Sequence, residues 1–130
     1  GSLAALTGAA MPTDAALDTM DLLAAITGEE NARGRQEFVQ QDNGSTGNYG
    51  FRSGNWKLQR HDSRKSRNLV VEKQLETGVV PQYQLFDLAQ DPGENENMME
   101  GQAAVAAKMI SRLDEIIELG RTRPPARATE

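Results

Sequence analysis

Residues 49–60 read YGFRSGNWKLQR, and no other part of the sequence constrains the architecture as strongly. The Ser-Gly-Asn turn at 53–55 separates two short runs of alternating character, which predicts an antiparallel hairpin. Successive side chains of a strand point to opposite faces. Trp56 and Leu58 therefore share one face and are expected to anchor the core, whereas Lys57 lies on the other face.

Further strand signals flank this hairpin. Glu37–Gln40 reads as a strand before it, and the glycine-rich loop of residues 42–48 joins the two. After the hairpin, Asn68–Gln74 fits either a strand or a short helix. In Tyr83–Leu88, apolar residues occur on both faces of the expected strand. We therefore expect this strand to be covered on both faces, as a central strand would be.

Helical signals occur near both ends of the chain. An apolar stripe predicts an amphipathic helix over Asp14–Thr27, preceded by a weaker helical turn at Leu3–Thr7. A second, longer amphipathic helix is expected from Ala103 to Gly120. The Asp-Pro-Gly-Glu turn at 91–94 leads into it, and Asn97 is expected to cap this second helix. The order indicates an α+β domain, in which a small antiparallel sheet of about four strands is packed by a long C-terminal helix.

Composition limits the possible chemistry. The chain has 130 residues, no cysteine and one histidine, which excludes disulfides, thiolate zinc sites and a cysteine nucleophile. We expect no metal site in this chain. No apolar run is long enough for a membrane span. A sequence pI near 4.9 argues against nucleic acid as a partner.

The net charge of −5 is distributed unevenly. Residues 1–32 carry a net −5 and residues 74–100 a net −6, whereas residues 33–73 carry a net +5. A basic segment between acidic flanks is typical of a solvated surface, but it also suits an anionic ligand. One hypothesis is therefore a standalone, non-enzymatic module that binds sulfated glycans or other polyanions through residues 33–73.

Two motifs together resemble the C-terminal region of sulfatases. They are GFRSGNWKL at residues 50–58 and LFDLAQDPGENEN at residues 85–97. Two further stretches are similar to the same family: MPTDAALDTMDLL at 11–23, and the loop of residues 40–50, which looks like that of bacterial arylsulfatases related to N-acetylgalactosamine-6-sulfatases. The resemblance extends over about residues 2–119, in the same order.

This resemblance implies a division of the chain. Residues 1–33 would be the helical end of the sulfatase catalytic domain, residues 34–120 the C-terminal sheet-plus-helix domain, and residues 121–130 a disordered tail. The main partner would then be the missing catalytic domain. Without it, the stripe of Leu17, Met20 and Leu23 loses its cover, so we expect the isolated chain to self-associate.

The resemblance also implies where sulfate ester hydrolysis takes place. Sulfatases use a formylglycine made from cysteine or serine in a C/S-x-P/A-x-R motif, and a calcium ion held partly by an early pair of aspartates. This sequence has no cysteine, no serine in that motif and no adjacent aspartate pair. Formylglycine and calcium are therefore expected in the parent catalytic domain. We expect this chain to have no catalytic residue and to be inactive alone.

By the same resemblance, the loop of residues 42–49 is best placed to reach the rim of a substrate cleft. Its side chains and their neighbours offer hydrogen-bonding groups, an aromatic ring and a cation for a sulfated carbohydrate or an aryl sulfate. The candidate rim residues are Asn43, Ser45, Asn48, Tyr49, Arg52 and His61. A periplasmic or secreted location is expected for the parent protein.

Overall fold

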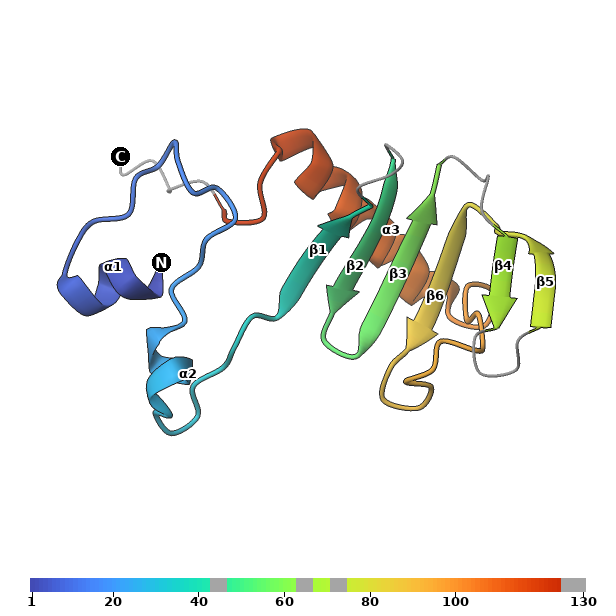
Figure 1. Ribbon diagram of the computed structural model, residues 1–130, viewed down its shortest axis with the longest axis horizontal. Coiled ribbons are helices and arrows are strands. Elements are labelled where there is room, and N and C mark those ends of the chain that lie inside the picture. The colour runs from blue at the N-terminus through green and yellow to red at the C-terminus, as the bar shows by residue number, and fades with distance from the viewer. Residues whose placement is uncertain (43–46, 63–66, 71–74, 125–130) are drawn as a thin grey trace. The chain divides into compact units, whose positions relative to one another are not determined.

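The computed structural model describes residues 1–42, 47–62, 67–70 and 75–124 (Figure 1). The chain divides into two compact units. The sheet unit comprises residues 37–114, and the terminal unit comprises residues 1–36 with the chain from residue 115 onward. The domain bounds expected at residues 33 and 120 stay predictions. No helix in the described part of the chain has the length and apolar character needed to cross a membrane.

A four-stranded antiparallel sheet forms the centre of the sheet unit. Its strands are β1 (Glu37–Gln41), β2 (Asn48–Ser53), β3 (Trp56–His61) and β6 (Tyr83–Asp87), in the order β1-β2-β3-β6. The predicted hairpin is confirmed as β2–β3. Phe51 pairs with Leu58, and Leu58 pairs with Leu85. These three side chains thus form one apolar row across the sheet.

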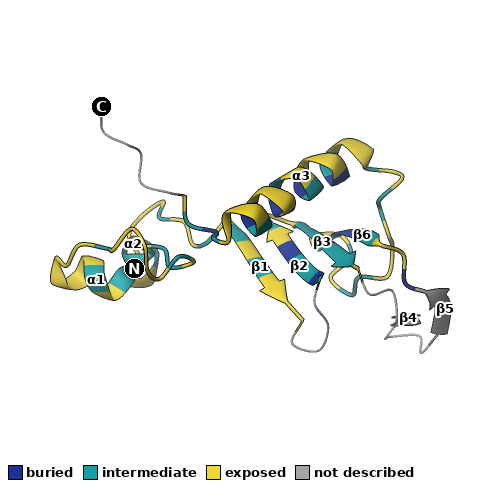
Figure 2. Ribbon diagram, turned by 90° about the horizontal axis from the view of Figure 1, so that it is seen from above, coloured by how far each residue is buried: buried dark blue, intermediate teal, exposed yellow. Residues whose placement is uncertain are grey.

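The long helix α3 (Ala103–Leu119) covers one face of this sheet, as Figure 2 shows, and confirms the predicted α+β class. Its Ala106, Met109 and Leu113 are buried, as are Phe51 and Leu58 on the strands. The helix ends at Gly120, whose φ of 63° lies in the left-handed region that glycine adopts easily. The core of the sheet unit therefore lies between α3 and the row of apolar strand residues.

β6 is covered on both faces although it stands at the edge of the four-stranded sheet. Gln84, Leu85 and Phe86 are buried in succession, as the sequence predicted. The edge itself is covered by a later segment. Leu85 N donates to Asn97 Oδ1 at 3.0 Å, and Met98 N donates to Leu85 O at 2.7 Å. These bonds satisfy backbone groups that an open edge would leave unpaired.

The expectation that Asn97 caps the long helix is wrong in detail. α3 begins six residues later at Ala103, after a stretch of turns. Asn97 Oδ1 instead accepts hydrogen bonds from Leu85 N and from Met99 N, the latter at 3.2 Å. Its side chain thus joins a local turn to the edge of β6.

A separate two-stranded ribbon lies between β3 and β6 in the sequence. It pairs β4 (Arg67–Val70) with β5 (Leu75–Val79) in antiparallel fashion. The choice between strand and helix for residues 68–74 is therefore decided in favour of a strand at 67–70. Residues 71–74 lie outside the described residues.

The amphipathic helix expected over Asp14–Thr27 is much shorter in the structure. The helical turn predicted at Leu3–Thr7 is present as α1 (Ser2–Thr7), but the second helix, α2, spans only Leu23–Thr27. Residues 14–22 are irregular, and Ala16 has a φ of 51°. The apolar residues recur at helical spacing here, but the backbone of residues 14–22 is not helical.

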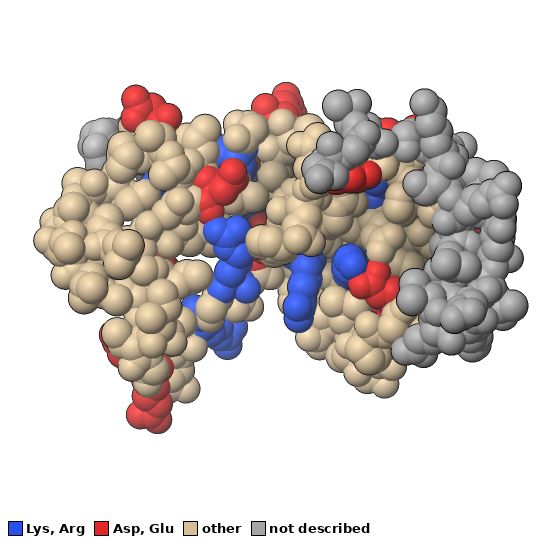
Figure 3. Space-filling view, in the orientation of Figure 1, with Lys and Arg blue, Asp and Glu red and all other residues tan. Residues whose placement is uncertain are grey.

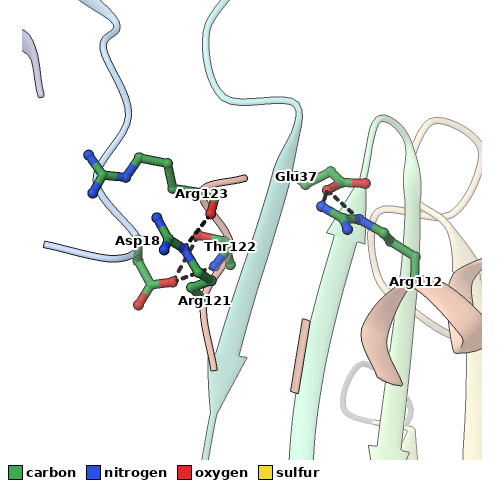
Figure 4. A network of polar contacts seen from close by, with 6 residues as sticks. All are labelled: Asp18, Glu37, Arg112, Arg121, Thr122 and Arg123. Carbon is green, nitrogen blue, oxygen red and sulfur yellow. Dashed lines mark hydrogen bonds and ion pairs between the residues drawn. The ribbon is translucent and has the colours of Figure 1, made fainter. Parts of the chain in front are cut away.

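The cause lies at the other end of the chain, within the same terminal unit. The Arg123 guanidinium donates to the carbonyl oxygens of Pro12 and Ala15, and Arg123 N donates to Leu17 O at 3.1 Å. Thr122 N and Thr122 Oγ1 both donate to Asp18 Oδ1, at 2.8 and 2.9 Å (Figure 4). Carbonyl groups that a helix would pair internally are thus bonded to a distant segment.

Candidate functional site

A polar hollow of about 410 Å³ opens beside strands β1, β2 and β3. Four of its ten lining residues have amide side chains, and the others are one aromatic ring, one imidazole, two cationic groups, one carboxylate and one glycine. We call it the polar hollow; it is lined by Gln40, Gln41, Asp42, Asn48, Tyr49, Gly50, Lys57, Gln59, Arg60 and His61.

Alternate residues of β3 supply one row of the polar hollow. Lys57, Gln59 and His61 share the face of the strand opposite to Leu58, because side chains alternate along a strand. His61 Nε2 lies 3.1 Å from Gln59 Oε1. The hydrogen-bonding groups of this row are therefore connected rather than independent.

Glu94 fixes the other end of this row. Lys57 Nζ lies 2.5 Å from Glu94 Oε1, and Gln59 Nε2 donates to Glu94 Oε2 at 2.6 Å. Glu94 belongs to the Asp-Pro-Gly-Glu turn and has a φ of 56°, which is unusual for a residue other than glycine. A strained backbone is retained where surrounding contacts over-determine it, and the two bonds to β3 provide such contacts.

Gly50 leaves the middle of the polar hollow without a side chain. It pairs with Gln59 across β2 and β3. A Cβ atom built on Gly50 would find Lys57 Cε at 4.0 Å as its nearest neighbour. Among the described residues, a side chain as small as a methyl group would meet only an ordinary van der Waals contact at this position.

Tyr49 and Arg60 are register partners on the other face of the same strands. The guanidinium carbon of Arg60 lies 6.0 Å from the centre of the Tyr49 ring. Arg60 also forms ion pairs with Asp62 at 2.8 Å and with Asp114 at 3.1 Å. The hydrogen bond from Arg60 lowers the pKa of Asp62, and Asp62 in turn raises the pKa of Arg60.

Two cations of the basic segment are engaged in ion pairs with acidic side chains. Lys57 pairs with Glu94 and Arg60 with two aspartates, and Figure 3 shows basic side chains beside acidic ones on the face drawn. Arg64 and Lys65, which belong to the same segment, lie outside the described residues. No group of three or more His, Cys, Asp or Glu side chains suited to a metal ion occurs in the described part of the chain.

The structure brings three of the six predicted rim residues together. Asn48, Tyr49 and His61 line the polar hollow. Arg52 does not: it is exposed beside the hairpin turn, where its Nε donates to Gly54 O at 3.0 Å. Asn43 and Ser45 lie outside the described residues.

Sequence reasoning missed other members of the polar hollow. It places Lys57 and Gln59 on the polar face of their strand without a role, and it places Glu94 only in a turn. The alternation along β3 is a usable signal, since Lys57 and Gln59 share a face with His61. Nothing local predicts that Glu94 reaches them from 35 and 37 residues away.

His61 is the only histidine of the chain, and its charge can be predicted. Burial lowers the pKa of His61 below its ordinary value of 6.5, against the opposing effect of a hydrogen bond with Gln84. We expect its imidazole proton signals in an NMR titration to give a pKa below 6.5. A value at or above 6.5 would show that the ring is not buried as described.

The sign of the effect on stability follows from this shift. The unfolded chain binds the proton of His61 more tightly than the folded chain does, so stability rises with pH where the two states differ. The contribution of His61 is complete above pH 6.5 and decreases as the pH falls below 6.5 towards the folded-state pKa. In the polar hollow near neutral pH, His61 is therefore mainly a neutral hydrogen-bonding group.

Comparison with known proteins identifies a related architecture. No protein-family model matches the chain. No curated protein matches it at a significant level. Among solved structures, however, 38 chains are similar. One is a Bacteroides thetaiotaomicron protein labelled 6S-sulf, described with the metabolism of multiple glycosaminoglycans: it is 27% identical, with a TM-score of 0.68 over 88% of this chain.

Two further matches support the same architecture. A Bacteroides thetaiotaomicron protein named as a sulfatase is 20% identical, with a TM-score of 0.57, and a 2-O GAG sulfatase is 21% identical, with a TM-score of 0.58. Each covers 90% of this chain, and at these identities each shows the fold alone. The chain resembles a portion of sulfatase structures. It spans 23% of the length of each of the three.

Proposed function

We propose that this chain is the C-terminal part of a sulfatase, a sulfuric ester hydrolase of the arylsulfatase and N-acetylgalactosamine-6-sulfatase group. The observation that carries the proposal is the match to the 6S-sulf protein at 27% identity over 88% of this chain. That match extends over the helical and sheet parts in one alignment. In this proposal the chain supports the catalytic domain, and its polar hollow forms part of the wall of the substrate cleft.

The chemistry of the polar hollow suits binding rather than bond cleavage. Ester hydrolysis at sulfur needs an activated nucleophile and a charge that stabilises the leaving oxygen. Lys57 is already paired with Glu94, and Arg60 with Asp62. The amides of Gln40 and its neighbours neither attack nor carry charge. The nucleophile, and the formylglycine and calcium of the parent, belong in this proposal to the catalytic domain.

A sulfated carbohydrate fits the polar hollow better than an aryl sulfate does. Amide side chains both donate and accept hydrogen bonds, which matches sugar hydroxyl groups. Tyr49 adds a ring with a polar end. Two of the similar structures are described with glycosaminoglycans or a GAG substrate. These observations favour a carbohydrate sulfate ester as the substrate of the parent protein.

The first test is the coding sequence upstream of the codon for Gly1. We expect several hundred residues that carry a C/S-x-P/A-x-R motif and an early pair of aspartates. The full-length product should then hydrolyse sulfate esters of a carbohydrate. A start codon directly before this segment would overturn the proposal and favour the polyanion-binding module, whose binding would weaken with salt.

The role of the polar hollow is tested in that full-length protein. We expect Tyr49→Ala to raise KM for a sulfated oligosaccharide by about three- to tenfold with little change in kcat, because a binding contact away from the reacting atoms is lost. Gln90→Ala, at an exposed position outside the polar hollow, is the matched control. An unchanged KM in Tyr49→Ala would show that the polar hollow is not part of the substrate cleft. That result would leave the assignment as a sulfatase unaffected.

A further inference from the structure

A second cavity lies on the α3 side of the sheet, between the strands and the first turns of α3. It has a volume of about 480 Å³, which is within the range of small-molecule sites. Phe51, Trp56 and Met109 supply its apolar walls, and the whole cavity belongs to the sheet unit. We call it the apolar cavity.

The sequence of α3 explains why this space is open. The helix starts with Ala-Ala-Val-Ala-Ala at residues 103–107, whereas its later turns carry longer side chains such as Met109 and Leu113. Ala104 and Val105 line the apolar cavity. Their short side chains do not fill the distance from the helix to Trp56. The wide, flat wall that Trp56 offers therefore lacks a partner of matching size.

The charged side chains at the rim of the apolar cavity carry a net positive charge. Arg112 donates from Nε at 3.0 Å and from Nη2 at 2.9 Å to Glu37 Oε2, so these two opposite charges offset each other (Figure 4). Lys108 lies one helical turn from both Ala104 and Arg112 on the same face of α3. It is exposed and forms no ion pair with any of the described residues. The rim thus carries one uncompensated positive charge.

From this arrangement we infer that the apolar cavity binds a small monoanion with a flat, apolar body, such as an aryl monocarboxylate. The ring of the ligand packs against Trp56 and Met109, where apolar surface is removed from water. The carboxylate of the ligand lies at the rim beside Lys108. The hydroxyl group of Ser53, which also lines the apolar cavity, adds a hydrogen-bond donor. This inference does not depend on the proposed sulfatase assignment.

The experiment uses 2-naphthoate as the probe and the full 130-residue chain. Trp56 is the only tryptophan, so its indole N–H gives a single NMR signal that reports on the apolar cavity. We expect a saturable shift of this signal with a dissociation constant near or below about 1 mM, as is usual for a ligand of this size. The uncharged analogue 2-naphthalenemethanol should bind more weakly.

Variants separate the charge from the apolar space. Lys108→Ala should weaken binding of 2-naphthoate about three- to fivefold, and Lys108→Glu about tenfold or more, as expected for an exposed charge pair. Val105→Phe and, as a milder change, Ala104→Leu should fill the space and abolish binding of both probes. Arg33→Ala, which removes an exposed positive charge elsewhere, should leave binding unchanged.

Two results would overturn the inference. The first is an indole signal that does not move at millimolar 2-naphthoate. The second is equal binding of 2-naphthoate and 2-naphthalenemethanol that Lys108→Glu does not change. Because the Lys108 variants alter an exposed side chain, they test the inference even if a cavity-filling variant does not fold.

Discussion

Leu58→Ala is expected to lower the free energy of unfolding of the sheet unit by about 2–5 kcal/mol, because it removes a large side chain from the centre of the core. Leu58 is 0% exposed and lies between Phe51 and Leu85 on the two neighbouring strands. Its removal leaves a cavity in the middle of the apolar row. Domains of this size are stable by only about 5–15 kcal/mol, so the loss is a large fraction of the total.

The measurement is urea unfolding followed by the fluorescence of Trp56. This tryptophan lies on β3, so its signal reports on the sheet unit rather than on the terminal unit. Gln90→Ala is the control within the sheet unit, since Gln90 is exposed and its truncation should change stability by less than about 0.5 kcal/mol. A loss below about 1 kcal/mol in Leu58→Ala would contradict the placement of Leu58 in the core.

The sheet and the long helix could be predicted because their signals are local. The turn at 53–55 and the alternation beside it predict β2 and β3, and the apolar period after Gln102 predicts α3. The burial of β6 on both faces followed from its apolar residues. Its place at the edge did not follow, because the cover over that edge comes from Asn97 and Met98 in a later segment.

The N-terminal region shows the opposite case. An apolar period over residues 14–27 favours a helix, and no local feature of that stretch argues against it strongly. The structure differs because Asp18 and the nearby carbonyl groups bind Thr122 and Arg123, which are more than 100 residues away in the sequence. Periodicity describes what a segment prefers alone, and tertiary hydrogen bonds can outweigh that preference.

The candidate site could be predicted only in part, because some of its residues are brought in by contacts that are distant in the sequence. Asn48 and Tyr49 were selected because the resemblance to sulfatases places their glycine-rich loop at the rim of a substrate cleft. His61 was selected from the basic neighbourhood after the hairpin, and it is the last residue of β3. Glu94 was not selected, although it holds Lys57 and Gln59 in place. Its contribution depends on the fold of the sheet unit, which brings a turn 35 residues later onto the face of β3.

Asn97→Ala is expected to lower the free energy of unfolding by about 1–3 kcal/mol, because it leaves a buried backbone donor without a partner. Leu85 is 0% exposed, and its N–H donates to Asn97 Oδ1 at 3.0 Å. The same oxygen accepts from Met99 N at 3.2 Å. Since β6 has no strand on this side within the four-stranded sheet, Leu85 N has no alternative partner from a neighbouring strand.

Asn97→Asp is the matched control for this prediction. An aspartate keeps an acceptor oxygen at the position of Oδ1, so Asn97→Asp should be clearly more stable than Asn97→Ala in urea unfolding. Amide hydrogen exchange at Leu85 should also accelerate in Asn97→Ala and stay slow in Asn97→Asp, since exchange reports local opening of the bonded group. Equal losses in the two variants would show that the Asn97 oxygen is not what closes the edge of β6, because only the acceptor is common to asparagine and aspartate there.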